Sequence, residues 1–162
     1  MTSRRKIVTW NTLRKKAAAL RREGRPVAFT NGCFDILHYG HVSYLEKAAR
    51  GRRALIVGLN SDRSIRAIKG PDRPVNEENE RAGVLAALAC VDYVVIFDQD
   101  TPYELIKAVR PDLLIKGADW KGRPVVGEDI VRAHGGRVEL VDYLPGLSTT
   151  NIIAAVRKRC AR

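Results

Sequence analysis

Cysteine, aromatic residues and long hydrophobic runs are all scarce in this 162-residue sequence. The three cysteines, Cys33, Cys90 and Cys160, lie far apart and form no C-x-x-C pair, which favours reduced thiols in a cytoplasmic protein over a disulfide framework. The longest apolar run covers only residues 84–91, whereas a membrane helix needs about 18 residues. No apolar segment follows the basic N-terminus, so we expect neither a secretory signal nor a membrane span.

Acidic residues are outnumbered, but only at the two ends of the chain. Lys and Arg total 29 against 18 Asp and Glu, which gives a formal net charge of +11. Residues 1–25 hold nine cations and one Glu, residues 157–162 hold four cations, and residues 26–156 hold 16 basic and 17 acidic side chains. A nucleic-acid binder more often spreads cations over a recognition face or interleaves them with aromatic residues. We therefore expect solvated faces on two terminal helices and no specific nucleic-acid partner.

The apolar residues predict strands that alternate with helices. The length favours one domain over residues 1–162, with residues 1–25 as a basic N-terminal helical extension. Strands are predicted at 27–30, 54–59, 93–97, 113–115 and 138–141. Short apolar strands alternating with helices indicate a parallel sheet that is covered on both faces. The expected fold class is therefore α/β, a Rossmann-like, doubly wound, five-stranded parallel sheet.

The helices are predicted from apolar faces and from start signals. Leu13, Ala17 and Leu20 share one face of a helix that ends at Gly24, and further helices are expected at 42–51, 76–89 and 128–134. A polar segment and a loop are expected between the second strand and Pro74. The expected start signals are Asn76 as an N-cap, Thr101 and Glu104 as a capping box around Pro102, and Ser148 or Thr149 as the cap of a last helix with Ile152, Ile153 and Val156 on its apolar face.

Polar side chains gather directly after four of the predicted strands. The residues concerned are Asn31 to His41 after the first strand, Asn60, Asp62 and Lys69 after the second, Lys116 to Trp120 after the fourth, and Pro145 to Thr150 after the fifth. In open parallel sheets ligands bind beyond the carboxyl ends of the strands, where the strand order reverses. Imidazole, ammonium and hydroxyl groups at one edge suit a polyphosphate.

His38 and His41 form the most informative pair. A spacing of three places both rings on one side of a helix start, and Gly40 between them lets a ligand approach the backbone. Free N–H groups at a helix start add an anion site. Two other interpretations remain open at this point: half of a zinc site, although the one other histidine is His134 and the cysteines are scattered, or ordinary structural histidines.

Several further residues are ambiguous from sequence alone. Lys69 and Arg81 could be solvated cations, and Trp120 could be a core aromatic residue or a wall for a stacked base. The segment Ser148 to Thr150 could be an N-cap or a set of phosphate-binding hydroxyls. Neither G-x-x-x-x-G-K-[ST] nor G-x-G-x-x-G occurs, which disfavours kinases and nicotinamide-dependent dehydrogenases.

Two motifs carry a resemblance to a known family. The segment Thr30 to His41 (TNGCFDILHYGH), together with Gly146 to Thr150 (GLSTT), resembles the H-x-G-H nucleotidyltransferase superfamily, also described as cytidylyltransferase-like. Residues 69–81 (KGPDRPVNEENER), 116–120 (KGADW) and 144–153 (LPGLSTTNII) resemble its branch that adenylylates D-glycero-β-D-manno-heptose 1-phosphate. The resemblance implies transfer of AMP from ATP to that sugar phosphate, giving ADP-heptose for the lipopolysaccharide core.

The same resemblance implies roles for particular residues. Charge on the α-phosphate and on the leaving pyrophosphate must be neutralised, and no strong general base is required. The expected catalytic residues are His38, His41 and Lys69. The expected nucleotide-binding residues are Cys33, Phe34, Gly40, Arg81, Lys116, Asp119, Trp120, Gly146, Ser148, Thr149 and Thr150. The expected substrate-binding residues are Asn31, Asp35, Asn60 and Asp62. No metal-ligating residue is assigned, because Mg²⁺ would arrive with ATP.

One departure from the superfamily pattern leaves an alternative open. Glycerol-3-phosphate cytidylyltransferases carry R-T-E-G-I-S-T-T where this sequence has Leu144 to Thr150 without the arginine. A cytidylyltransferase for a polyol phosphate is therefore the second hypothesis, and a basic binding module without catalysis is the third. The resemblance also implies a homo-oligomer, expected to be a dimer, and a separate heptose-7-phosphate kinase, since 162 residues leave no room for one.

Overall fold

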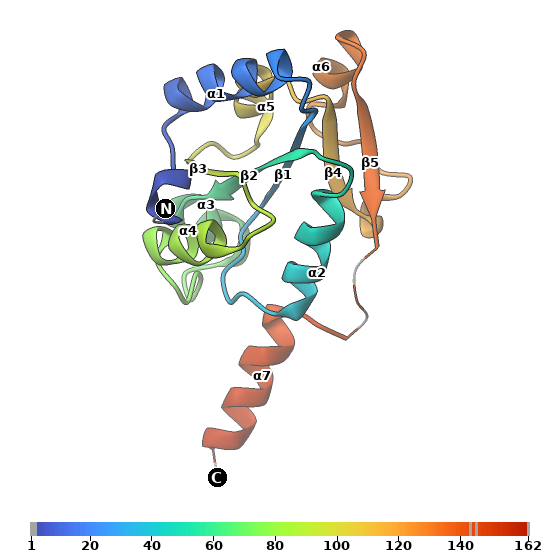
Figure 1. The fold of residues 1–162 in the computed structure, drawn as a ribbon. Coiled ribbons are helices and arrows are strands. Elements are labelled where there is room, and N and C mark those ends of the chain that lie inside the picture. Colours follow the sequence, from blue (N-terminus) through green and yellow to red (C-terminus); the bar gives the residue numbers. More distant parts are fainter. Residues whose placement is uncertain (1–2, 143, 145, 162) are drawn as a thin grey trace.

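A five-stranded, all-parallel sheet forms the centre of the molecule (Figure 1). The computed structural model describes residues 3–142, 144 and 146–161. The strands are β1 (Val27–Gly32), β2 (Ala54–Asn60), β3 (Tyr93–Phe97), β4 (Leu113–Gly117) and β5 (Arg137–Val141), and their order is β3-β2-β1-β4-β5. The chain winds outward from β1 to β3 in one direction and returns beside β1 as β4. The strand order therefore reverses between β1 and β4.

Helices cover both faces of this sheet. On one face lie α1 (Trp10–Arg22), α5 (Tyr103–Val109) and α6 (Glu128–Ala133), packed on side chains such as Phe29 and Ile56. On the other face lie α2 (Tyr39–Ala48) and α4 (Glu78–Ala87), packed on Ala28 and Leu55. Successive strand residues point to opposite faces, so each strand contributes to both cores. The expected fold class is confirmed.

The N-terminal helix α1 belongs to one of these cores. The predicted face of Leu13, Ala17 and Leu20 is buried, and the side chain of Thr9 caps the helix start by accepting a hydrogen bond from the Thr12 N–H. A short 3-10 helix, η1 (Ser3–Lys6), precedes α1. Residues 1–25 thus include a helix that covers one face of the sheet.

The last helix, α7 (Thr149–Cys160), projects away from the body of the molecule (Figure 1). Ser148 is its N-cap and accepts a hydrogen bond from the Asn151 N–H at 3.1 Å, so Ser148 is the cap among the two candidates. Of the expected apolar face, Ile152 and Ile153 are half-buried, whereas Val156 remains 54% exposed. The helix is therefore held at its first turns, beside the rest of the fold.

Three local expectations were wrong. Helix α3 (Asp62–Lys69) occupies part of the segment expected as polar loop, with Ile65 as its one buried apolar side chain. Helix α4 is capped by Glu77 rather than Asn76, because the Asn76 N–H and side-chain amide both donate to Asp35. Helix α5 begins after Pro102, and no side chain caps it, since Thr101 lies one residue before the cap position.

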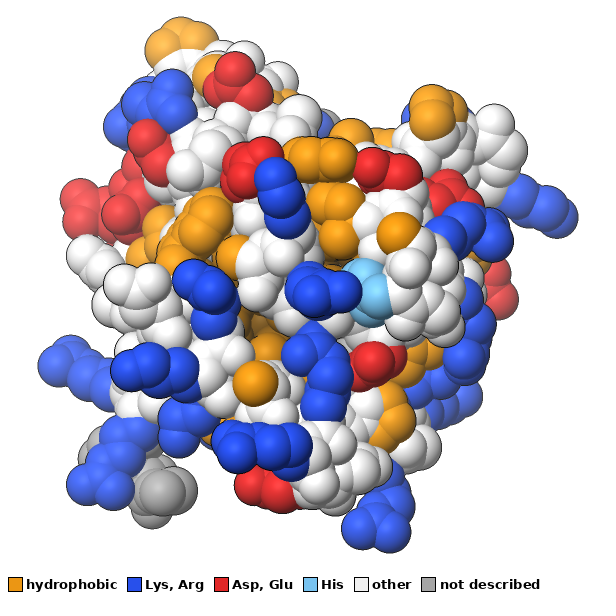
Figure 2. Space-filling model, turned by 90° about the horizontal axis from the view of Figure 1, so that it is seen from above, with side chains coloured by type: hydrophobic (Ala, Val, Ile, Leu, Met, Phe, Trp, Pro, Cys, Tyr) orange, Lys and Arg blue, Asp and Glu red, His pale blue; other side chains and the backbone are white. Residues whose placement is uncertain are grey.

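The surplus cations lie mainly on exposed surface. Figure 2 shows Lys and Arg side chains scattered over one face, with Asp and Glu between them. On α1, Arg14, Lys15 and Arg22 are exposed, and so are Arg157 to Arg159 on α7. No helix of the described residues has both the length and the apolar character needed to cross a membrane. The three cysteines are free thiols, as expected.

The burial of α1 generates the first prediction. Leu13→Ala should lower the free energy of unfolding by about 2–5 kcal/mol, because it leaves a cavity beneath a helix that covers the sheet. The matched control on the exposed face of the same helix is Lys15→Ala, which should change it by less than about 0.5 kcal/mol. Denaturant unfolding of both variants measures the difference. Equal losses would contradict the packing of α1 in the core.

Candidate functional site

A cavity of about 580 Å³ opens at the carboxyl ends of the strands. It lies at the point where the strand order reverses, the place where open parallel sheets bind ligands. Its walls come from the segment after β1, the start of α2, the loop after α3, the segment after β4 and the start of α7. Its lining residues are Asn31, Gly32, Cys33, Phe34, Asp35, His38, Gly40, His41, Tyr44, Lys69, Arg73, Asp119, Leu144, Leu147, Ser148, Thr149 and Thr150.

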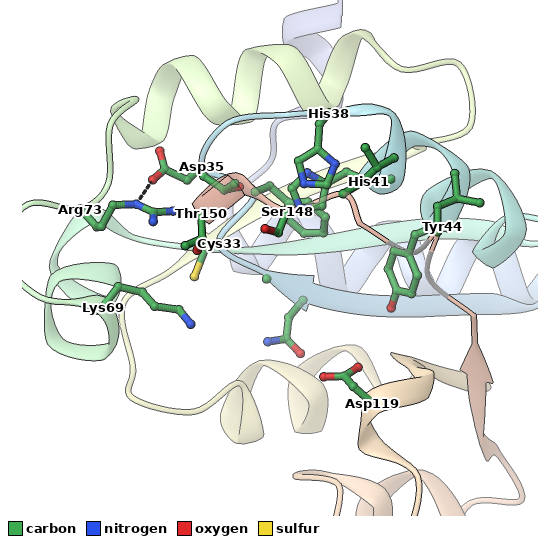
Figure 3. Close-up of a pocket in the computed structure, with 17 residues that line it drawn as sticks. Cys33, Asp35, His38, His41, Tyr44, Lys69, Arg73, Asp119, Ser148 and Thr150 are labelled. Atoms are coloured by element: carbon green, nitrogen blue, oxygen red, sulfur yellow. Dashed lines mark hydrogen bonds and ion pairs between the residues drawn. The ribbon is translucent and has the colours of Figure 1, made fainter. Parts of the chain in front are cut away.

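The two histidines stand together at the start of α2 (Figure 3). His38 is the N-cap residue, and the rings of His38 and His41 stack with centroids 3.9 Å apart at 24°. The ring of Phe34 meets His41 edge-on at 5.2 Å. A Cβ on Gly40 would lie 3.0 Å from the His38 ring and 3.2 Å from Leu147. The glycine therefore lets the imidazole fold back over the helix start.

The surroundings of both imidazoles favour the neutral form. Burial lowers the pKa of His38, and burial together with the neighbouring His38 lowers the pKa of His41 to about 4. Within the described residues, both Nδ1 atoms are buried without a hydrogen-bond partner. Such an unpaired group costs about 1–3 kcal/mol, so the pair is poised to gain a polar ligand.

The start of α7 forms a second wall. Ser148, Thr149 and Thr150 line the cavity, and Thr149 Oγ1 donates to the Ile36 carbonyl oxygen at 3.4 Å, which ties α7 to the loop before α2. Gly146 is not among the lining residues; its carbonyl oxygen accepts from the Asn151 side chain. Pro145, which belongs to the same sequence motif, lies outside the described residues. Free N–H groups and hydroxyls at this helix start can bind phosphate oxygens.

Two cations come from the end of α3 and from the loop that follows it. Lys69 and Arg73 both line the cavity, and the Lys69 ammonium points into it (Figure 3). The Arg73 Nε donates to Asp35 Oδ2 at 2.5 Å, while Asp35 Oδ1 accepts from the N–H groups of Val75 and Asn76. The buried Asp35 carboxylate therefore holds this loop against the end of β1. Burial raises the pKa of the adjacent Cys33 thiol, and the nearby cations of Lys69, Arg81 and Arg73 oppose that rise.

Arg81 lies behind the cavity wall rather than in it. Its side chain is fully buried and donates to the carbonyl oxygens of Cys33, Asn60 and Asn76 and to Asp62 Oδ1. Asn60 and Asp62 are used there too, and neither is a lining residue. Arg81, Asn60 and Asp62, which the sequence predicted to contact ligands, instead form one hydrogen-bond network. This network supports the turn after β1 from the side away from the cavity.

The segment after β4 contributes one lining residue and one supporting group. The 3-10 helix η2 (Ala118–Trp120) places Asp119 at the cavity. Lys116, at the end of β4, donates to Asn31 Oδ1 at 2.6 Å and lies 5.2 Å from the centre of the Trp120 ring. Burial lowers the pKa of Lys116 to about 8, partly opposed by Asp119. Neither Lys116 nor Trp120 lines the cavity.

The expected set misses five lining residues, namely Gly32, Tyr44, Arg73, Leu144 and Leu147. Two of them carried a sequence signal: Tyr44 lies three residues after His41 on the same helix face, and Arg73 follows Lys69 by four residues. The Tyr44 hydroxyl shares a hydrogen bond with Thr30 at 2.8 Å, beneath the cavity floor. Within the described residues, no three His, Cys, Asp or Glu side chains gather as a metal cluster.

The low pKa of His41 predicts a pH dependence of stability. The unfolded chain binds a proton at His41 near pH 6.5, but the folded chain binds it only near pH 4. The unfolded state therefore binds more protons between these values, and the free energy of unfolding should fall as the pH falls from about 6.5 to 4. His41→Gln should make this fall shallower. Chemical unfolding at a series of pH values measures it, and parallel curves for the two proteins would contradict the assignment.

Comparisons with known proteins identify the family of this chain. The cytidylyltransferase-like family model matches residues 29–155. The chain is 56% identical over 154 residues to the bifunctional protein HldE of Syntrophotalea carbinolica and 53% identical over 154 residues to that of Trichlorobacter lovleyi. Each match covers 95% of this chain and 31% of the relative, so the chain spans about a third of the length of these curated relatives.

A solved structure is also similar. It is the crystal structure of the lipopolysaccharide core biosynthesis protein from Thermoplasma volcanium, with a TM-score of 0.60 and 26% sequence identity. The match covers 74% of this chain and 96% of that one. Since the family model spans most of the chain and includes the H-x-G-H segment and the start of α7, the chain belongs to the cytidylyltransferase-like family.

Proposed function

We propose that this chain transfers AMP from ATP to D-glycero-β-D-manno-heptose 1-phosphate. An oxygen of the sugar phosphate attacks the α-phosphorus of ATP, a new P–O bond forms, the bond from the α-phosphorus to the bridging oxygen breaks, and pyrophosphate leaves. The products are ADP-heptose and pyrophosphate. The observation that carries the proposal is the stacked pair of His38 and His41 in one cavity with Lys69, Arg73 and the start of α7.

The reaction requires alignment and charge neutralisation more than proton transfer. A sugar phosphate is already an anion near pH 7, so its oxygen needs no strong base. Neutral His38 and His41 can donate hydrogen bonds from ring N–H groups to the triphosphate, where charge develops in the transition state. The free N–H groups at the start of α2 would add to this field.

The other cavity residues would interact with the β- and γ-phosphates of ATP and with the negative charge of the two substrates. The hydroxyls of Ser148 and Thr150, with the backbone N–H groups of Thr149 and Thr150, would hold the β- and γ-phosphates at the start of α7. Lys69 and Arg73 would screen the repulsion between the two substrates, since Lys69, at the end of α3, and Arg73, in the loop after it, both line the cavity. Mg²⁺ would enter as part of the ATP substrate complex and needs few protein ligands.

The adenylyl and heptose assignments rest on similarity. The relatives are bifunctional HldE proteins, and one similar structure is a lipopolysaccharide core biosynthesis protein. The segments at 69–81, 116–120 and 144–153 carry the resemblance to the heptose branch. A homodimer, a cytoplasmic location and a heptose-7-phosphate kinase acting earlier in the same route remain predictions.

A substrate panel tests this function. Equal ATP and CTP are offered with Mg²⁺ and either heptose 1-phosphate or glycerol 3-phosphate, and the products are resolved by mass. We expect ADP-heptose, with CTP disfavoured by about 10–200-fold in kcat/KM because a pocket shaped for a purine leaves a smaller base poorly packed. Predominance of a CDP product would contradict the adenylyl assignment and favour the polyol cytidylyltransferase.

The histidine pair generates a prediction for turnover. His38→Ala and His41→Ala should each lower kcat by about 10²–10³-fold, the scale for removing one preorganised donor to developing charge. The matched control is His134→Ala, since His134 lies at the end of α6 and its ring contacts the Pro111 carbonyl oxygen at the opposite edge of the sheet. Normal kcat in either cavity variant would remove that histidine from the mechanism.

A further inference from the structure

Lys116 is an unusual group in this fold because its cationic side chain is almost entirely buried. Only 6% of the residue is exposed, at the carboxyl end of β4. Its one hydrogen bond within the described residues goes to the neutral amide of Asn31, and the Trp120 ring lies 5.2 Å away. Burying an ammonium group costs free energy, and the lowering of the Lys116 pKa to about 8 reflects that cost, which the charge of Asp119 only partly offsets.

The contact with Asn31 fixes the direction of an amide. An ammonium group has three donors and no acceptor, so the atom of Asn31 that faces Lys116 must be Oδ1. The Asn31 Nδ2 group is therefore turned away from Lys116, and it makes no hydrogen bond to any described residue. Since Asn31 lines the cavity and Lys116 does not, the contact leaves two N–H donors at the cavity surface.

The Lys116–Asn31 pair lies between β1 and β4, where the strand order reverses. Asn31 is the last residue but one of β1, and Lys116 is the last but one of β4, so the hydrogen bond joins the two adjacent strands between which the order reverses. Asp119 lines the cavity just beyond. Of the other donors of the cavity, His38, His41 and the start of α7 are proposed to bind the triphosphate. Lys69 and Arg73 are proposed to screen the repulsion between the two substrates.

We propose that Lys116 is a positioning residue that holds the Asn31 amide so that its N–H groups donate to a phosphate oxygen of the sugar 1-phosphate. This rests on the proposed function, because it names the acceptor substrate of the same site. An amide donor orients the attacking phosphate without the full positive charge that would draw electron density from its nucleophilic oxygen. Lys116 supports that donor from beneath without touching the substrate.

Steady-state kinetics of three variants test the inference. Lys116→Met keeps an unbranched side chain as far as Cε but removes the ammonium donors. It should raise the KM for heptose 1-phosphate by about 10-fold or more, the scale of a hydrogen bond to a charged group. The KM for ATP should change by less than about twofold, because the triphosphate donors are unaltered. Lys116→Arg, which can still donate to Oδ1, should restore part of the loss. Lys121→Met, at an exposed position on the same segment, is the matched control and should behave as wild type.

A double-mutant comparison separates positioning from direct binding. If Lys116 acts through Asn31, then adding Lys116→Met to Asn31→Ala should cost little beyond Asn31→Ala alone. Multiplying losses in the double variant, a rise confined to the KM for ATP, or wild-type behaviour of Lys116→Met would each overturn the inference.

A measurement without turnover covers variants that fold poorly or turn over too slowly. In wild type, the Asn31 side-chain NH₂ resonances should shift when heptose 1-phosphate is added, and in folded Lys116→Arg they should shift in the same direction. Resonances that do not move would overturn the inference even if activity is normal. Failure of the proposed function is distinguishable, since wild type would then form no ADP-heptose from ATP.

Discussion

The central constraint on this molecule is that β1 pairs with β2 on one side and with β4 on the other. Both pairings are parallel, so the chain must leave the carboxyl end of each strand and cross a face of the sheet before it returns. The crossovers diverge at β1 and β4, and a hollow remains between them at that edge. The residues that follow the two strands, from Asn31 to His41 and from Lys116 to Trp120, are thereby brought to one cavity.

Buried hydrogen bonds convert that hollow into a defined site. Asp35 holds Arg73 and the backbone of the following loop, and Arg81 joins the carbonyl oxygens of Cys33 and Asn60 from below. A second contact, from Lys116 to Asn31, spans the strand reversal. Asp35, Arg73 and Asn31 line the cavity, whereas Arg81 and Lys116 do not. All of them restrict the motion of the segments that form the cavity walls. Preorganisation of this kind is what a reaction governed by alignment and charge requires.

The sequence was sufficient for the sheet and for the edge that carries the site, because both follow from short-range patterns. Apolar runs marked all five strands, and polar residues after them marked the cavity. It was insufficient where one residue serves a distant one: Asn76 bonds to Asp35 instead of capping α4, and Arg81 with Asn60 and Asp62 forms a support rather than a wall. Arg73 was missed because its place depends on an ion pair with Asp35, 38 residues away.

The central claim is that the two cavity histidines bind the nucleotide. The chain has three histidines, and the third, His134, contacts Pro111 at the opposite edge of the sheet. The most direct measurement is therefore ring ¹⁵N NMR of all three during titration with Mg²⁺ and a non-hydrolysable ATP analogue. We expect the His38 and His41 resonances to shift together, as the N–H groups of the neutral rings donate to phosphate oxygens, while those of His134 stay in place. Unmoved cavity histidines at saturating nucleotide, or an equal response at His134, would contradict it.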